Sequence, residues 1–230
     1  MKAKEPLLLR FNETDWTVFR LGENTVLLKA LSILNFEEIH QSTYALKKIL
    51  GNKLTDIVPA YDSIALFGQY DTLFEKLNQS VISIEKFQIK QEPIEIPICY
   101  EKGLDLELLS EALKLNIEEI IRIHLKGVYC SLFIGFTPGF IYADGLDRRL
   151  AYPRKKNPRT HILSGSVGIG GEQTGIYSLD SPGGWNIIGR TPIKLFSVEE
   201  DPPMKIQVGT PFTFKRINNE TFQEWEDSKS

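Results

Sequence analysis

The sequence predicts an α+β protein of two domains, in which a β-sheet covered by two helices is followed by a closed β-barrel. Over residues 1–92, apolar runs of strand length alternate with segments of helical periodicity. Residues 127–190 hold 12 of the 17 glycines and four prolines, with no good helical pattern. The polar Lys-Gln-Glu-Pro run at 90–93 separates the two patterns, so the second domain is expected over residues 93–230.

The first domain is expected to follow the split βαβ order, in which both helices cover one face of the sheet. Asn35 and Glu38 form a capping box at the start of the first helix, and Gly51 ends it. Pro59 favours an edge position or a bulge for its strand. The expected elements are an apolar run at 7–11, a strand at 25–31, a helix at 35–51, strands at 54–61 and 63–68, a helix from Asp71 and a closing strand near 81–90.

The second domain is expected to begin with a strand at 95–100 and two short helices. Asp105 and Asn116 are the expected caps, and the second helix covers residues 117–125. Turn signals then separate short β-prone runs at close intervals, which favours a closed or highly bent barrel. The polar residues from Asn218 onward are expected to fray. The β-prone runs are 128–136, 140–143, 166–169, 187–188, 193–198 and 211–217.

Composition and charge exclude several classes of protein. The net charge of −3 gives no case for nucleic acid, and no apolar run is long enough to span a bilayer. The first residues lack the apolar stretch of a secretory signal. Cys99 and Cys130, the only cysteines, lie in apolar runs and are expected to stay reduced in a cytoplasmic protein. Cysteines and histidines are too few and too widely spaced for a zinc site.

Arginines mark the first candidate site. Arg154 and Arg159 each follow a proline, which holds them on restrained, non-helical backbone. Arg190 follows Gly189 at an expected strand start. Residues 137–195 carry eight Lys or Arg and four Asp or Glu, a local charge of +4 in an acidic chain. Since guanidinium groups suit bidentate capture of carboxylate or phosphate, an anionic ligand is indicated; the alternative is a set of solvated loop charges.

Glycine and aromatic residues surround these arginines in the sequence. The run at 164–171 includes Gly165, Gly168 and Gly170, whose amides are expected to form an anion-binding nest. It is neither a Walker A loop nor a dinucleotide fingerprint. Phe136 and Phe140, within Gly-Phe-Thr-Pro-Gly-Phe, are expected to form either a pocket wall or a packed barrel corner, and Trp185 a wall or lid.

His124 shares a helical face with Ile117, Ile120 and Ile121, a spacing more typical of a core histidine than of a catalyst. Its place just before the glycine-rich module keeps it a candidate general acid or base.

Five ordered motifs resemble the B subunit of the bacterial 5-oxoprolinase, a family also labelled allophanate hydrolase subunit 1 that includes a sporulation histidine-kinase inhibitor. They are Gly-Phe-Thr-Pro-Gly-Phe at 135–140, the Pro-Arg pairs at 153–159, Gly-Ser-Val-Gly-Ile-Gly-Gly at 165–171, Gln-Thr-Gly-Ile-Tyr at 173–177 and Ser-Pro-Gly-Gly-Trp to Gly-Arg-Thr-Pro at 181–192. The resemblance implies a ferredoxin-like first domain and a cyclophilin-like barrel. It also implies C and A subunits as partners and ATP-dependent opening of 5-oxo-L-proline to L-glutamate, with Mg²⁺ left open.

On this resemblance, Arg154, Arg159 and Arg190 are expected to hold anionic groups, together with the amides of 165–171. Ser166, Gln173 and Tyr177 are expected to orient a small lactam or amide, and His124 to move protons. ATP binding is implied by the resemblance alone, because no nucleotide motif is present in the chain. The alternatives are a regulator that inhibits a sensor histidine kinase without chemistry of its own, and a component of an allophanate or urea-type amidohydrolase.

Overall fold

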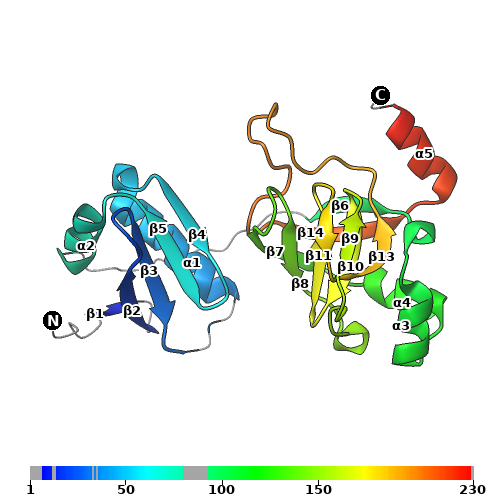
Figure 1. Cartoon of the computed structure of the whole chain (residues 1–230), viewed down its shortest axis with the longest axis horizontal. Coiled ribbons are helices and arrows are strands. Elements are labelled where there is room, and N and C mark those ends of the chain that lie inside the picture. The colour runs from blue at the N-terminus through cyan, green and yellow to red at the C-terminus, as the bar shows by residue number, and fades with distance from the viewer. Residues whose placement is uncertain (1–6, 12–13, 33, 35, 80–92, 229–230) are drawn as a thin grey trace. The chain divides into compact units, whose positions relative to one another are not determined.

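The computed structural model describes residues 7–11, 14–32, 34, 36–79 and 93–228 of the 230-residue chain. The chain divides into two compact units, residues 1–89 and 90–230 (Figure 1). Both units combine sheet and helix, and the second contains a nearly closed sheet of seven strands, so the predicted α+β fold class is confirmed. None of the helices in the described ranges is long and apolar enough to cross a membrane.

The first unit is an antiparallel sheet in the order β1-β2-β3-β5-β4, with two helices packed on it. Pro59 ends β4 at the sheet edge, as its missing N–H predicts. The core lies on one face of the sheet, where Trp16, Leu28 and Leu66 meet Leu46 and Leu73 of the helices. The elements are β1 (Leu7–Phe11), β2 (Thr14–Arg20), β3 (Thr25–Ala30), α1 (Phe36–Leu50), β4 (Asp56–Pro59), β5 (Ser63–Phe67) and α2 (Tyr70–Gln79).

One strand of this sheet was not expected from the sequence. β2 pairs along one side of β3, while β5 pairs along its other side. Trp16 and Val18 of β2 are buried, whereas Asp15 and Phe19 are exposed, which indicates a half-buried strand. The expected cap Asn35 and the expected strand near 81–90 lie outside the described residues.

The second unit is built on a seven-stranded sheet in the order β13-β10-β11-β8-β7-β14-β6. Its two edges meet: Cys99, directly after β6, exchanges two backbone hydrogen bonds with Arg190 of β13, at 2.9 and 3.0 Å. This pair closes the sheet into a barrel (Figure 1). The strands are β6 (Ile94–Ile98), β7 (Tyr129–Ile134), β8 (Ile141–Asp144), β10 (Ser166–Gly170), β11 (Gln173–Ile176), β13 (Asn186–Arg190) and β14 (Pro211–Arg216); a separate pair joins β9 (Arg159–Ile162) to β12 (Ser181–Gly183).

Helices α3 (Leu106–Leu113) and α4 (Ile117–Leu125) lie close to their predicted positions. The side chain of Asn116 accepts a hydrogen bond from the amide of Glu119, so its prediction as a cap is confirmed. The prediction that Asp105 caps α3 is wrong for the side chain, which makes no capping bond and instead binds cations described below.

Two other expectations for this unit are wrong. The polar end of the chain does not fray: α5 (Asn219–Asp227) begins at the cap Asn218 and buries Phe222 completely. The run 193–198 forms only one bridge, between Phe196 and Met204, and is otherwise irregular backbone.

Candidate functional site

The glycine-rich run at 164–171 is not an open loop. It forms β10, which pairs with β11 on one side and β13 on the other. The amide of Gly165 donates to the carbonyl of Tyr177, and the amide of Gly171 donates to that of Tyr152. These bonds leave the run without the free consecutive amides that an anion-binding nest requires.

The glycines instead make room for Trp185. A Cβ at Gly170 would lie 2.8 Å from the Trp185 ring and 3.0 Å from the side chain of Arg154. A Cβ at Gly168 would lie 3.0 Å from Cβ of Trp185, and one at Gly175 would lie 2.8 Å from the Phe140 ring. The missing side chains therefore let a large indole ring lie against the barrel wall, where it is 4% exposed.

This indole is part of a small apolar cavity, the Trp185 pocket, of about 310 Å³. Aromatic rings form its walls, and Phe140 packs behind them against Tyr142, Tyr177 and Trp185. Its size and apolar lining suit a small molecule with a few polar groups. The lining residues are Phe136, Tyr142, Arg154, Pro158, Tyr177, Pro182, Gly183, Gly184 and Trp185.

Two polar groups of the Trp185 pocket have no ion-pair or hydrogen-bond partner among the described residues. The guanidinium carbon of Arg154 lies 4.6 Å from the centroid of the Trp185 ring, and Arg154 makes no ion pair with any residue in the described ranges. The buried hydroxyl of Tyr177 has no hydrogen-bond partner there either. Burial raises the pKa of Tyr177 to about 12, opposed by the nearby Trp185 amide and the charge of Arg154. The hydroxyl is therefore a neutral donor at physiological pH.

Phe136 completes the rim of the pocket under backbone strain. Its φ of +72° lies in the left-handed region, which non-glycine residues rarely adopt. The ring stays 64% exposed and meets Phe140 edge to face at 5.7 Å. Strain of this kind persists only where the surrounding structure holds the residue in place, and it is more frequent at functional sites than elsewhere.

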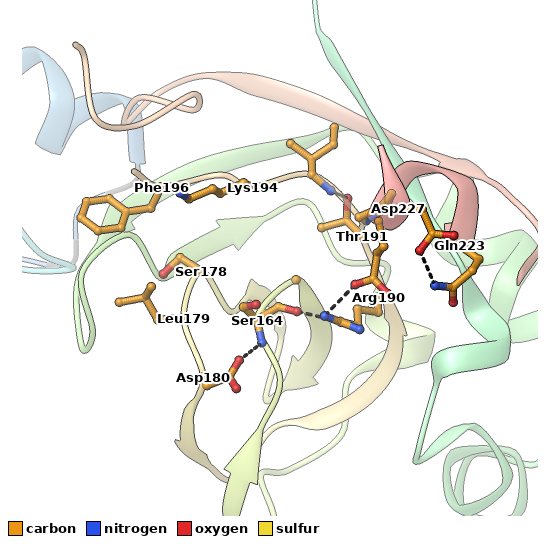
Figure 2. Close-up of a pocket in the computed structure, with 14 residues that line it drawn as sticks. Ser164, Ser178, Leu179, Asp180, Arg190, Thr191, Lys194, Phe196, Gln223 and Asp227 are labelled. Atoms are coloured by element: carbon orange, nitrogen blue, oxygen red, sulfur yellow. Dashed lines mark hydrogen bonds and ion pairs between the residues drawn. The ribbon is translucent and has the colours of Figure 1, made fainter. Parts of the chain in front are cut away.

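Arg190 lies in a different and larger cavity, the Arg190 pocket, of about 940 Å³ (Figure 2). Its Nε donates to the carbonyl of Ser164 at 2.7 Å, and its Nη2 lies 3.0 Å from Glu226 of α5. Asp180 also lines this pocket and accepts from the Ser164 amide. The Arg190 charge is therefore already paired within the protein, unlike that of Arg154.

Arg159 lines neither pocket. Its guanidinium makes two hydrogen bonds to the carboxylate of Asp105, at 2.8 and 2.7 Å. The structure thus separates the three arginines that the sequence predicted around one guest: Arg154 lies at the Trp185 pocket, Arg159 on Asp105 and Arg190 at α5. Arg159 and Arg190 are drawn away from Arg154 because each pairs with a carboxylate from a distant part of the chain, Asp105 and Glu226 respectively.

His124 lies inside the barrel core. Its ring is fully buried between Tyr100, Tyr129 and Phe214, and its Nδ1 shares a 2.7 Å hydrogen bond with the Tyr100 hydroxyl. Burial lowers the pKa of His124 to about 3, and Nε2 has no partner among the described residues. The ring lines neither the Trp185 nor the Arg190 pocket.

The remaining predicted residues lie in the barrel wall. Ser166 begins β10 and is 4% exposed, opposite Arg190 in register. Gln173 begins β11, and Gly165 lines the Arg190 pocket with a φ of +81°. Of the residues at the Trp185 pocket, sequence reasoning missed Tyr142, Pro158, Pro182, Gly183 and Gly184. Tyr142 lies two residues beyond Phe140, a spacing that could have indicated it.

The amino-acid sequence of the chain is similar to sequences of known proteins. Residues 16–206 match the family described as carboxyltransferase domain, subdomain C and D. The B subunit of the 5-oxoprolinase of Bacillus subtilis is 30% identical over 237 residues, covering 94% of this chain and 98% of the relative. The protein of the same name from Haemophilus influenzae is 39% identical over 150 residues, covering 64% of this chain and 70% of the relative.

A solved structure supports the same fold. The urea carboxylase of Kluyveromyces lactis matches with a TM-score of 0.73 over 96% of this chain and 24% of that chain. The two sequences are 16% identical in this match, so the likeness concerns the fold alone.

Proposed function

Because the chain belongs to the carboxyltransferase domain C and D family and, within it, to the B subunits of 5-oxoprolinases, we propose that it is one component of an ATP-dependent 5-oxoprolinase. The proposed reaction opens 5-oxo-L-proline to L-glutamate in a cytoplasmic complex with the C and A subunits, and the isolated chain is inactive. The names of the relatives do not favour the kinase-regulator alternative.

The observation that carries the proposal is the unpaired Arg154 at the mouth of an apolar pocket of about 310 Å³. The substrate has a flat, apolar five-membered ring, one carboxylate and one lactam carbonyl. In the proposed complex the ring lies against the Trp185 indole, and the carboxylate binds the guanidinium of Arg154. The hydroxyl of Tyr177 then donates to the lactam carbonyl.

Tyr177 gives this arrangement a chemical role. Opening a lactam places negative charge on its carbonyl oxygen, and a fixed donor in a dry site stabilises that charge. Burial raises the pKa of Tyr177 to about 12, so its proton stays in place to donate. The buried rings of Trp185 and Phe140 lower the effective dielectric constant beside the hydroxyl, which strengthens the interaction.

Neither pocket fits a nucleoside triphosphate. Among the residues that the structure describes, Arg154 is the only cation lining the Trp185 pocket, and the Arg190 pocket places the carboxylates of Asp180, Glu226 and Asp227 beside its two cations. No group of three or more His, Cys, Asp or Glu suited to a metal occurs among the described residues. We therefore assign ATP and any Mg²⁺ to another component of the complex and derive no step through them.

The test uses the complex co-expressed with its partner subunits. We expect ATP turnover to rise with 5-oxo-L-proline, and Arg154→Gln to raise the KM for 5-oxo-L-proline about tenfold, the effect of losing one charged hydrogen bond. Arg148→Gln is the matched control, because Arg148 is exposed and lines neither pocket. Turnover that ignores 5-oxo-L-proline would refute the function, and equal KM values for the two variants would refute the role of Arg154.

A further inference from the structure

Asp105 is the most heavily bonded carboxylate of the second unit among the described residues, although it lies 3% exposed between the barrel and α3. It accepts two hydrogen bonds from Arg159, at 2.8 and 2.7 Å, and pairs with Nζ of Lys155 at 2.7 Å. The amide of Ile187 in β13 donates to it at 2.7 Å. A buried carboxylate with this many donors holds its neighbours in fixed places.

These bonds attach one chain segment, residues 153–159, to the barrel. Lys155 and Arg159 anchor the segment to Asp105, and the Lys155 amide also donates to the carbonyl of Gly184 at 2.7 Å. The Asn186 side chain donates to the carbonyl of Pro153 at 3.0 Å. The segment is thus fixed at both ends and in the middle.

The same segment supplies one side of the Trp185 pocket. Arg154 and Pro158 line the pocket, and each is the immediate neighbour of a residue that Asp105 holds. With Lys155 and Arg159 anchored, Arg154 is left to stack on the Trp185 ring.

Asp105 also limits the number of cationic side chains that face a ligand in the Trp185 pocket. Residues 153–159 contain four cations, and Asp105 pairs with Lys155 and Arg159. Lys156 is exposed and lines neither the Trp185 nor the Arg190 pocket. In the described part of the chain, Arg154 therefore remains the single cation lining the Trp185 pocket, which matches a ligand with one negative charge.

We propose that Asp105 is a positioning residue that fixes the segment 153–159 across the Trp185 pocket and makes the pocket selective for a ligand with a single carboxylate. The inference rests on the proposed function for the identity of the ligand. Asp105 touches no ligand in this arrangement, and it acts through the placement of Arg154.

The experiment compares two lactams that differ in the carboxylate. The full chain is titrated calorimetrically with 5-oxo-L-proline and with 2-pyrrolidinone, which has the same ring and no charge. We expect wild type to favour 5-oxo-L-proline about tenfold. Asp105→Asn should lose most of this preference, because Arg154 is no longer held in place, while still binding the neutral ring.

The ratio separates positioning from stability, because a merely destabilised protein weakens both ligands alike. Asp147→Asn is the matched control: it also removes one carboxylate, but from an exposed pair with Arg149 outside the pocket. Arg159→Gln serves if Asp105→Asn does not fold, since Arg159 is partly exposed and its loss removes half of the anchor. An unchanged ratio in the variants that fold overturns the proposal.

If wild type binds neither lactam, the proposed ligand is refuted. A second measurement then tests the positioning role of Asp105 without a ligand. Amide hydrogen exchange over residues 153–159, including the Lys155 amide, should then be faster in Asp105→Asn than in Asp147→Asn. Equal exchange in the two variants would overturn the positioning role as well.

Discussion

Protonation of the buried His124 should make the second unit unstable in mild acid. The ordinary pKa of histidine is about 6.5, and burial lowers that of His124 to about 3. Between these values the unfolded chain binds a proton that the folded chain excludes, so stability falls as the pH falls. The buried ring, packed against Tyr129 and Phe214, has no described carboxylate beside it to stabilise its charged form.

The size of this effect follows from the interval between the two pKa values. Each pH unit below about 6.5 costs about 1.4 kcal/mol of unfolding free energy, and the loss continues to about pH 3. From pH 7.5 to pH 4.5 the contribution of His124 therefore amounts to about 2.7 kcal/mol. His124→Gln keeps an amide near the Tyr100 hydroxyl and removes the titrating ring, so its stability should depend less on pH by this amount.

The assay is denaturant unfolding, followed by intrinsic fluorescence at several pH values between 7.5 and 4.5. Ile120→Val controls for general destabilisation, because Ile120 is buried in the same helix and cannot titrate. It should lower stability and keep the wild-type slope. If wild type and His124→Gln lose stability in parallel, His124 has access to solvent protons, and its assignment to the core is wrong.

Three further results are expected. Gly170→Ala should weaken 5-oxo-L-proline binding at least about tenfold while the chain still folds, because the added Cβ displaces the Trp185 ring; calorimetric titration measures this. Asp105 should stabilise the protein at neutral pH: burial alone would raise its pKa, but bonds from Arg159, Lys155 and the Ile187 amide hold that pKa below its usual range. The difference in unfolding free energy between wild type and Asp105→Asn should therefore shrink as the pH falls below about 4, and a constant difference would contradict it. Phe222→Ala should cost about 3 kcal/mol of the docking of α5, seen as faster amide exchange confined to residues 219–227; protection equal to wild type would contradict it.

The sequence predicted the elements whose local signals agree with their packing. The helix at 117–125 was placed to the residue, because Asn116 caps it and its apolar residues recur at helical spacing. α5 was missed because its sequence is mostly polar, and its position depends on one aromatic side chain, Phe222, which is fully buried beside Arg190.

The candidate site was half predictable for a similar reason. Trp185, Phe136 and Arg154 were singled out by residue type, and they do line one pocket. The two Pro-Arg pairs look alike in sequence, yet Arg159 turns to Asp105, 54 positions away, which no local pattern reveals. Gly165, Gly168 and Gly170 were wrongly predicted to form an anion-binding nest. A nest loop requires glycine, but so does a strand that packs under a large ring such as that of Trp185, and the sequence does not distinguish the two.

The bridge between Cys99 and Arg190 joins the end of the first strand of the second unit to β13. β6 also pairs in parallel with β14, so residues 94–98 meet residues 212–216. Contacts so distant along the chain are formed late and slowly. During synthesis, residues 94–99 can pair on both sides only after more than a hundred following residues, including β13 and β14, have left the ribosome. The unit can therefore complete its fold only after translation of its last strand, and removing β14 should leave the whole sheet open.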